Sequence, residues 1–201
     1  LARNVARADY HRKNEFISPA FILQKFDVTD GDLHLGAGGD IGDGLREDVR
    51  AFLIEQAGGL TGFARCLGAA DVVRSVQFAR AHGLLVAVRG GGHSLSGQSV
   101  CDDGLMIDLA PMRGVRVDPS RRLARAGGGA LLSDLDRESL AFGLVTTTGT
   151  VSHTGAGGLT LGGGFGRLSR RYGLTCDQLT SVDIVTADGR LREASATDND
   201  D

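Results

Sequence analysis

The feature that most constrains this chain is a run of three glycines followed by a histidine, at the end of a short apolar segment. Residues 84–88 are few and rich in β-branched side chains, so they are predicted to form a buried strand. Arg89, three glycines at residues 90–92 and His93 follow directly. Successive glycines permit positive φ and leave their N–H groups uncovered, which creates a concave site for a phosphate or pyrophosphate. The sequence therefore predicts an anion-binding loop with a histidine at its edge.

A second glycine-rich stretch, residues 146–173, repeats this pattern downstream. Alanine would cost less backbone entropy than glycine in ordinary helix or strand, so these glycines indicate turns or close approaches. Either stretch alone is equally compatible with plain glycine turns in a β-rich domain. The two together, one of them carrying RGGGH, favour a nucleotide-binding site.

Composition and charge exclude several classes of protein. With 201 residues, 41% of them hydrophobic, the chain can form one domain with a full core. A net charge of −3 gives no reason to expect nucleic acid or an anionic membrane as a partner. Three cysteines, Cys66, Cys101 and Cys176, include no C-x-x-C pair, which favours free buried thiols over a metal site or disulfide framework.

No apolar run reaches the length of a membrane span, and no signal peptide is visible. A cytoplasmic location is therefore expected. Because the chain begins at Leu1 rather than at a methionine, we also expect a part of the protein to precede it.

The regular elements predicted along the chain alternate irregularly, which is typical of an α+β domain. They are helices at residues 70–82 and 131–142 and strands at 84–88, 104–109, 114–117, 123–126, 182–186 and 191–194. Residues 46–56 are also predicted to be a helix, because Val49, Phe52, Leu53 and Gln56 would lie on adjoining faces. Residues 1–60 as a whole are left unassigned.

Five segments together carry a specific resemblance. They read AVRGGGHS, GLMIDLAPMRGVRVD, ARAGGGALLSDLD, GLTLGGGFGRLSRRYGLTCDQL and DIVTADG, in that order. The stretch from residue 64 to 194 resembles the FAD-binding (PCMH-type) domain of the vanillyl-alcohol oxidase superfamily, and within it the berberine-bridge-enzyme-like FAD-linked oxidases. The resemblance implies an α+β fold of two small sheets, one of mixed direction, flanked by helices, with FAD extended between them.

The same resemblance implies a domain boundary. The FAD-binding domain is expected to occupy residues 61–201. In the family a substrate-binding domain follows it, and that domain would begin after Asp201. We therefore expect this chain to be a fragment that is inactive alone.

The resemblance assigns the central role to His93. In the family, the histidine of the RGGGH loop forms a covalent bond from a ring nitrogen to the 8α-methyl group of the flavin. The alternative is a histidine that only hydrogen-bonds the pyrophosphate. Many relatives attach the flavin a second time through a cysteine, but alignment on Gly149 and Gly155 puts Val151 at that position, so a single attachment is expected. His153 lies in the same loop and could face the flavin, but the favoured expectation is a surface histidine.

The two loops supply the remaining contacts that the resemblance implies. Backbone N–H groups of the first loop would cradle the pyrophosphate, the second loop would line the ribityl and diphosphate track, and one strand residue would meet the adenine. The implied cofactor-binding residues are Arg89, Gly90, Gly91, Gly92, His93, Ser94, Gly97, Gln98, Thr148, Gly149, Ser152, Gly155, Gly157, Gly158, Gly162, Gly163 and Val185. No catalytic base can be named, because in such enzymes it usually comes from the substrate domain, and no metal is implied.

The implied function is that of an FAD-dependent oxidase acting on a small molecule. It would take a hydride from an alcohol, sugar or amine and pass the electrons to O2. A Rossmann domain is excluded, because no G-x-G-x-x-G follows a strand and opens a helix with an acidic residue about twenty positions on. A P-loop is excluded because no G-K-[ST] occurs. The alternative that stays open is a truncated, non-catalytic FAD-binding module.

Overall fold

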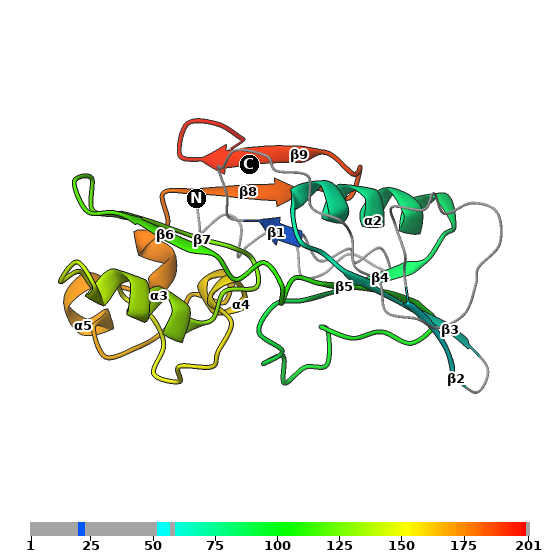
Figure 1. Ribbon diagram of the computed structural model, residues 1–201, viewed down its shortest axis with the longest axis horizontal. Coiled ribbons are helices and arrows are strands. Elements are labelled where there is room, and N and C mark those ends of the chain that lie inside the picture. Colours follow the sequence, from blue (N-terminus) through cyan, green and yellow to red (C-terminus); the bar gives the residue numbers. More distant parts are fainter. Residues whose placement is uncertain (1–19, 23–51, 57–58, 200–201) are drawn as a thin grey trace.

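The computed structural model describes residues 20–22, 52–56 and 59–199. Small sheets flanked by helices make up this part of the chain, so the α+β class is confirmed (Figure 1). In chain order the elements are β1 (Ala20–Ile22), β2 (Phe52–Gln56), β3 (Gly59–Arg65), α2 (Ala69–Ala81), β4 (Leu85–Arg89), β5 (Gly104–Asp108), β6 (Val115–Asp118), β7 (Leu123–Ala126), α3 (Leu132–Leu140), α4 (Ala156–Leu161), α5 (Ser169–Tyr172), the 3-10 helix η1 (Thr175–Gln178), β8 (Ser181–Val185) and β9 (Leu191–Ser195).

The largest sheet has four strands in the order β2-β3-β5-β4. β3, β5 and β4 run parallel, whereas β2 pairs with β3 in the antiparallel direction, so the expected mixed sheet is confirmed. The carboxyl ends of the three parallel strands meet at one edge, which is where open α/β sheets bind their ligands. The glycine loop leaves β4 at this edge.

The helix predicted at residues 46–56 is wrong for its last five residues. Phe52–Gln56 is strand β2, with Phe52 opposite Phe63 and Gln56 opposite Gly59 in the register with β3. A short apolar run satisfies helical and strand periodicity alike, and here the pairing with β3 provides the backbone partners. Residues 46–51 lie outside the described part of the chain.

Helix α2 packs on β4, β5 and β8 and so joins two of the sheets (Figure 1). Val72, Val76 and Ala79 lie on its buried face, in one core cluster with Ile107 of β5 and Val185 of β8. Full burial of a valine stabilises the fold by roughly 1.5–3 kcal/mol relative to an exposed position. This helix therefore fixes the position of the β4 loop relative to the three-stranded sheet.

That three-stranded sheet has the order β1-β8-β9. The turn between β8 and β9 contains Gly189 with a φ of +74°, and it contacts α2 through hydrogen bonds from Gln77 to the Gly189 carbonyl and from Arg80 to the Asp188 carbonyl. The predicted hairpin is thus present. The four-stranded and three-stranded sheets are the two that were expected, and the β6–β7 hairpin forms a separate two-stranded ribbon.

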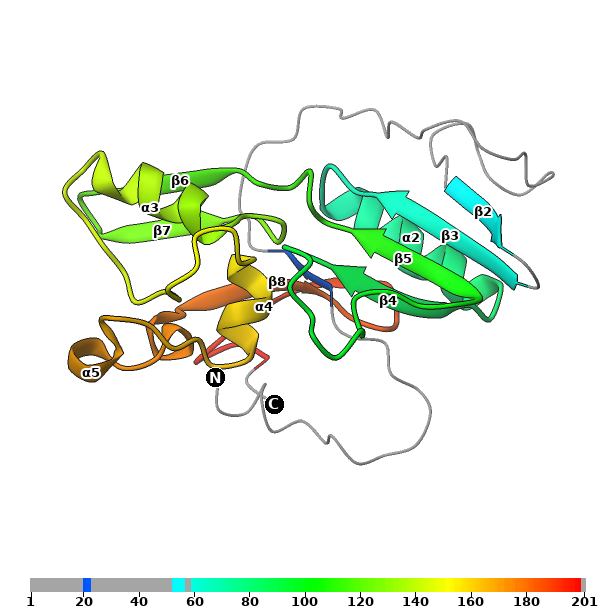
Figure 2. The same ribbon diagram turned by 90° about the horizontal axis from the view of Figure 1, so that it is seen from below.

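Helix α3 packs against the β6–β7 ribbon and forms a second lobe with α4 and α5 (Figures 1 and 2). Asp134 connects its first turn to the loop before β6. The carboxylate accepts two hydrogen bonds from Arg113, at 2.9 and 2.8 Å, and one from the Leu131 N–H. Burial acts to raise the pKa of Asp134, but these hydrogen bonds and the charges of Arg113 and Arg137 hold the pKa below the usual carboxyl value.

We expect Asp134→Asn to lower the free energy of unfolding at pH 7 by about 2 kcal/mol, because it removes charge-assisted hydrogen bonds from a buried group. The pKa of Asp134 is lower in the folded chain than in the unfolded one. Its contribution is therefore full above the ordinary carboxyl pKa of about 3.9 and is lost as the pH falls through the folded value. Denaturation curves of wild type and variant should converge in acid. Asp136→Asn in the same helix is the control, and an equal loss at every pH would contradict the ionic role.

The three cysteines are free. Cys66 is fully buried, and its burial raises the pKa of the thiol to about 12, which leaves it unreactive at neutral pH. Cys101 and Cys176 are only half-buried. The expectation of buried thiols therefore holds for Cys66 alone.

Candidate functional site

The glycines of three separate segments meet at the carboxyl edge of the four-stranded sheet. Gly91 and Gly155 lie back to back, so a Cβ on Gly91 would be 2.3 Å from the Gly155 nitrogen. A Cβ on Gly90 or on Gly157 would lie 3.2 or 3.4 Å from the carbonyl oxygen of Gly128. The structure thus brings together the two predicted loops, and it adds a third segment, around Gly128, that was not predicted to belong to the site.

Backbone hydrogen bonds position the second loop. The N–H groups of Leu132 and Ser133 donate to the carbonyls of Thr154 and Ser152, at 2.9 and 2.8 Å, and the Ala156 N–H donates to the Ala130 carbonyl. The start of α3 therefore runs beside residues 152–156. As a result, α4 lies alongside the loop that follows β4 (Figure 2).

An ion pair at the end of β4 stabilises the start of the first loop. Arg89, the last residue of β4, donates to the buried carboxylate of Asp108 at 2.9 Å. Gly92 has a φ of +72° and lies over this guanidinium, since a Cβ there would be 3.3 Å from the Arg89 Nε. The Arg89 side chain therefore supports the loop, while the predicted contact of its backbone with the pyrophosphate stays a prediction.

The N–H groups of the loop lack backbone partners, and residues 92–94 are exposed to a ligand, whereas the Gly91 nitrogen lies against the Gly155 backbone. Within the described part of the chain, the N–H groups of residues 90–94 donate no backbone hydrogen bond. His93, Ser94 and Gln98 are exposed, and the Ser94 and Ser96 hydroxyls lie 3.1 Å apart. Unpaired donors on a glycine loop fit a pyrophosphate, because they can bind its oxygens without displacing an existing partner. The residues present therefore fit the diphosphate of FAD.

The predicted glycines fall into two kinds. At Gly91 and Gly155 two backbones touch, so glycine is required there for a structural reason. Gly97, with a φ of +76°, and Gly158 have nothing within 4 Å of a Cβ position, so they border open space that a ligand could enter. Two further predicted glycines end helix α4: Gly162 is its C-cap, and the Gly163 carbonyl accepts from the Cys176 N–H.

The remaining predicted residues, Thr148, Gly149 and Val185, are half-buried or buried. Thr148 packs against the loop after α4, since a Cβ on Gly166 would lie 1.7 Å from the Thr148 carbonyl oxygen. Gly149 faces the side chains of Leu159 and Leu132. Val185 is 1% exposed at the end of the central strand β8, and its proposed backbone contact with adenine stays a prediction.

Thr147, next to the predicted contact Thr148, is 1% exposed and its hydroxyl has no hydrogen-bond partner among the described residues. A buried hydroxyl left unpaired costs roughly 1–3 kcal/mol. We therefore expect Thr147→Val to raise the free energy of unfolding of the ligand-free protein by about 1 kcal/mol in urea denaturation.

Thr175→Val is the matched control for this change. The Thr175 hydroxyl is also buried, but it donates to the Gly164 carbonyl at 3.2 Å, so its removal should lower the free energy of unfolding by about 1 kcal/mol. If both variants lose stability equally, the Thr147 hydroxyl is paired and the assignment is wrong.

His93 and His153 lie together. Their ring centroids are 4.6 Å apart, with the planes inclined at 50°. Both side chains are exposed, so His153 is a surface residue as expected, but its place beside His93 was missed. The sequence holds one signal: His93 follows Gly91 by two residues, and His153 precedes Gly155 by two.

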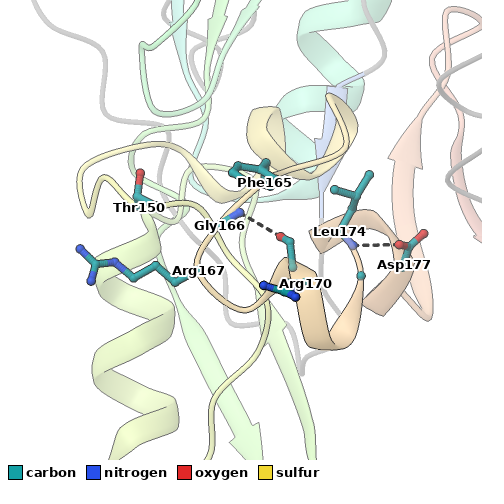
Figure 3. Close-up of a pocket in the computed structure, with 9 residues that line it drawn as sticks. Thr150, Phe165, Gly166, Arg167, Arg170, Leu174 and Asp177 are labelled. Carbon is teal, nitrogen blue, oxygen red and sulfur yellow. Dashed lines mark hydrogen bonds between the residues drawn. The ribbon is translucent and has the colours of Figure 1, made fainter.

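A pocket of about 470 Å³ lies beside the second glycine-rich stretch, over the segment that contains α5 and η1 (Figure 3). Its floor is ordered by hydrogen bonds from the Leu174 N–H to Asp177 and from the Gly166 N–H to the Ser169 hydroxyl. The lining residues are Thr150, Phe165, Gly166, Arg167, Ser169, Arg170, Gly173, Leu174 and Asp177. None of the residues predicted to hold FAD is among them, but seven of the nine belong to the second glycine-rich stretch. Gly166 also packs against the predicted contact Thr148, so the pocket borders the second loop.

Fold and site together define an FAD-binding domain of the vanillyl-alcohol oxidase type. The chain belongs to the FAD binding domain family, whose model matches residues 61–195. Among curated proteins it is 42% identical over 126 residues to the (R)-6-hydroxynicotine oxidase of Paenarthrobacter nicotinovorans, a match that covers 63% of this chain and 28% of that oxidase.

Solved structures agree with this assignment. The 6-hydroxy-D-nicotine oxidase of Arthrobacter nicotinovorans matches 73% of this chain and 33% of its own, with a TM-score of 0.68 and 36% identity. The glucooligosaccharide oxidase of Acremonium strictum, which carries a 6-S-cysteinyl, 8α-N1-histidyl FAD, matches 69% of this chain and 30% of its own, with a TM-score of 0.63 and 32% identity. The chain thus spans about a third or less of the length of these relatives.

No helix among the described residues is long and apolar enough to cross a bilayer.

Proposed function

We propose that this chain binds FAD along its two glycine loops and attaches it covalently through His93. The observation that carries the proposal is the back-to-back contact of Gly91 and Gly155, which places the RGGGH loop against the second loop. The N–H groups of the RGGGH loop donate no backbone hydrogen bond among the described residues. Flavin attached through a histidine in glucooligosaccharide oxidase, with a related fold, supports the attachment. The likeness between the two proteins makes His93 the candidate residue.

A single attachment is proposed rather than two. Val151 stands where the family resemblance, matched on Gly149 and Gly155, places a cysteine in many relatives, and valine has no sulfur with which to form a thioether. Val151 is 44% exposed, so no packing requirement in the described structure accounts for its presence. Peptide mapping of the loaded protein should find flavin on one peptide only.

At the level of the whole protein, we propose an FAD-linked oxidase that acts on an alcohol, sugar or amine with O2 as the acceptor. When bound, the flavin accepts the two electrons, while the protein binds and orients it. Oxidases of a hydroxynicotine and of a glucooligosaccharide among the relatives support this range of small-molecule substrates. Oxygen consumption with a panel of alcohols, sugars and amines separates an oxidase from a non-catalytic FAD-binding module.

Acid denaturation tests the binding proposal directly. The purified protein is precipitated in acid, and the visible spectra of pellet and supernatant are recorded. Flavin absorbance in the pellet is the expected result, because a covalent bond survives unfolding. Flavin in the supernatant alone would contradict the covalent attachment but retain FAD binding. If the protein is incubated with FAD before purification and neither fraction then contains flavin, both the covalent attachment and FAD binding are contradicted.

A further inference from the structure

The pair formed by His93 and His153 is a built feature of the fold. The two rings come from loops far apart in the sequence and lie 4.6 Å apart between centroids. The Gly91–Gly155 contact lies two residues from each histidine and brings the loops together. On the other side, the carbonyls of Ser152 and Thr154 accept hydrogen bonds from the start of α3.

The backbone around His153 presents the ring toward His93. The Thr154 N–H donates to the Val151 carbonyl at 3.0 Å, which closes a tight turn with His153 inside it. Both imidazoles are exposed, so neither is required for core packing. An exposed ring held by a hydrogen-bonded turn beside a proposed attachment residue is placed to act on that residue.

We infer that His153 is a positioning residue that orients His93 and accepts its proton during attachment of the flavin. This inference rests on the proposed covalent bond at His93. As a ring nitrogen of His93 bonds to the flavin's 8α carbon, the imidazole must give up the proton on its other nitrogen, and one C–H bond of the methyl group must break. The electron pair passes to the flavin, and O2 then removes it together with two protons as hydrogen peroxide.

A second imidazole suits this role for a chemical reason. A neutral imidazole offers one unprotonated nitrogen as an acceptor and can hold the proton near physiological pH. General base catalysis by a positioned side chain contributes about 10²–10⁴-fold to a rate. Among the described residues, no carboxylate is shown bonded to His93, and His153 is the titratable side chain that the structure shows in contact with it.

The test follows covalent loading over time. Flavin-free chain is incubated with FAD in air, and acid-precipitated flavin is measured at intervals for wild type, His153→Gln, His153→Ala and the control His82→Gln. His82 is also exposed, but it lies at the end of α2, where its ring packs on Phe78. We expect both His153 variants to load about a hundredfold more slowly, while the control matches wild type.

Two further readouts separate proton transfer from a structural effect. The Kd for noncovalent FAD should change by no more than about twofold in the His153 variants, because the loop backbone is unchanged. Free imidazole in the buffer should restore much of the loading rate of His153→Ala, since it can enter the vacated space and accept the proton. A loss of noncovalent binding equal to the loss of loading would overturn the role.

Other outcomes discriminate between the two proposals. If wild type and both His153 variants load at the same rate, attachment stands and the role of His153 is wrong. If mapping finds the flavin on the His153 peptide, that residue is the attachment site and its positioning role is overturned. If wild type binds FAD but never retains it in acid, the covalent proposal fails and the role of His153 fails with it.

Discussion

Replacing His93 by alanine is expected to remove all acid-stable flavin from the protein while leaving the fold intact. The side chain is exposed at the edge of the glycine loop and supports no core contact, so its loss should change the free energy of unfolding by no more than about 0.5 kcal/mol. The proposed covalent bond forms on the His93 imidazole, and alanine has no ring nitrogen to form it. The flavin content of the acid pellet should therefore fall to background.

The measurement is the visible spectrum of the precipitated protein, with thermal unfolding as the check on folding. His82→Ala is the matched control, because it removes an exposed imidazole away from the loops. A yellow pellet from the His93 variant would mean that another residue attaches the flavin. Mapping of the labelled peptide would then decide whether that residue is His153.

Replacing Gly91 by alanine is expected to cost about 3 kcal/mol of folding free energy and to abolish loading with FAD. A Cβ at this position would lie 2.3 Å from the Gly155 nitrogen and 2.4 Å from the Gly155 Cα. Both atoms belong to a backbone, so no rotamer change can relieve the clash and the two loops must separate. Urea denaturation measures the first effect and fluorescence titration with FAD the second.

Gly158→Ala is the control for the Gly91 change. Gly158 lies in α4, where an added Cβ meets nothing within 4 Å, so alanine should leave stability unchanged or raise it by up to about 1 kcal/mol. Equal losses in the two variants would show that the Gly91–Gly155 contact is not what holds the loops together.

Much of the fold follows from local pattern. The strands at β4 and β5, both hairpins and helices α2 and α3 lie within one or two residues of their predicted ends, because periodicity and glycine or Asp-Gly turns are local signals. The RGGGH motif and the resemblance that it carries predict the FAD-binding family, which the family model confirms. The short helices α4 and α5 were missed, because glycine disfavours a helix and in this segment tertiary contacts override that preference.

By itself, then, the sequence determined the class of fold, the family and the two loops that bear its motifs. Only the tertiary structure decided that Phe52–Gln56 is a strand and that His153 lies beside His93. It also decided that Gly91 and Gly155 contact each other, whereas Gly97 and Gly158 border open space. The physical reason is the range of the interactions. Turns and amphipathic faces depend on residues close together in the sequence. Strand pairing and loop contacts join segments distant in the chain, and no local pattern predicts which segments will meet.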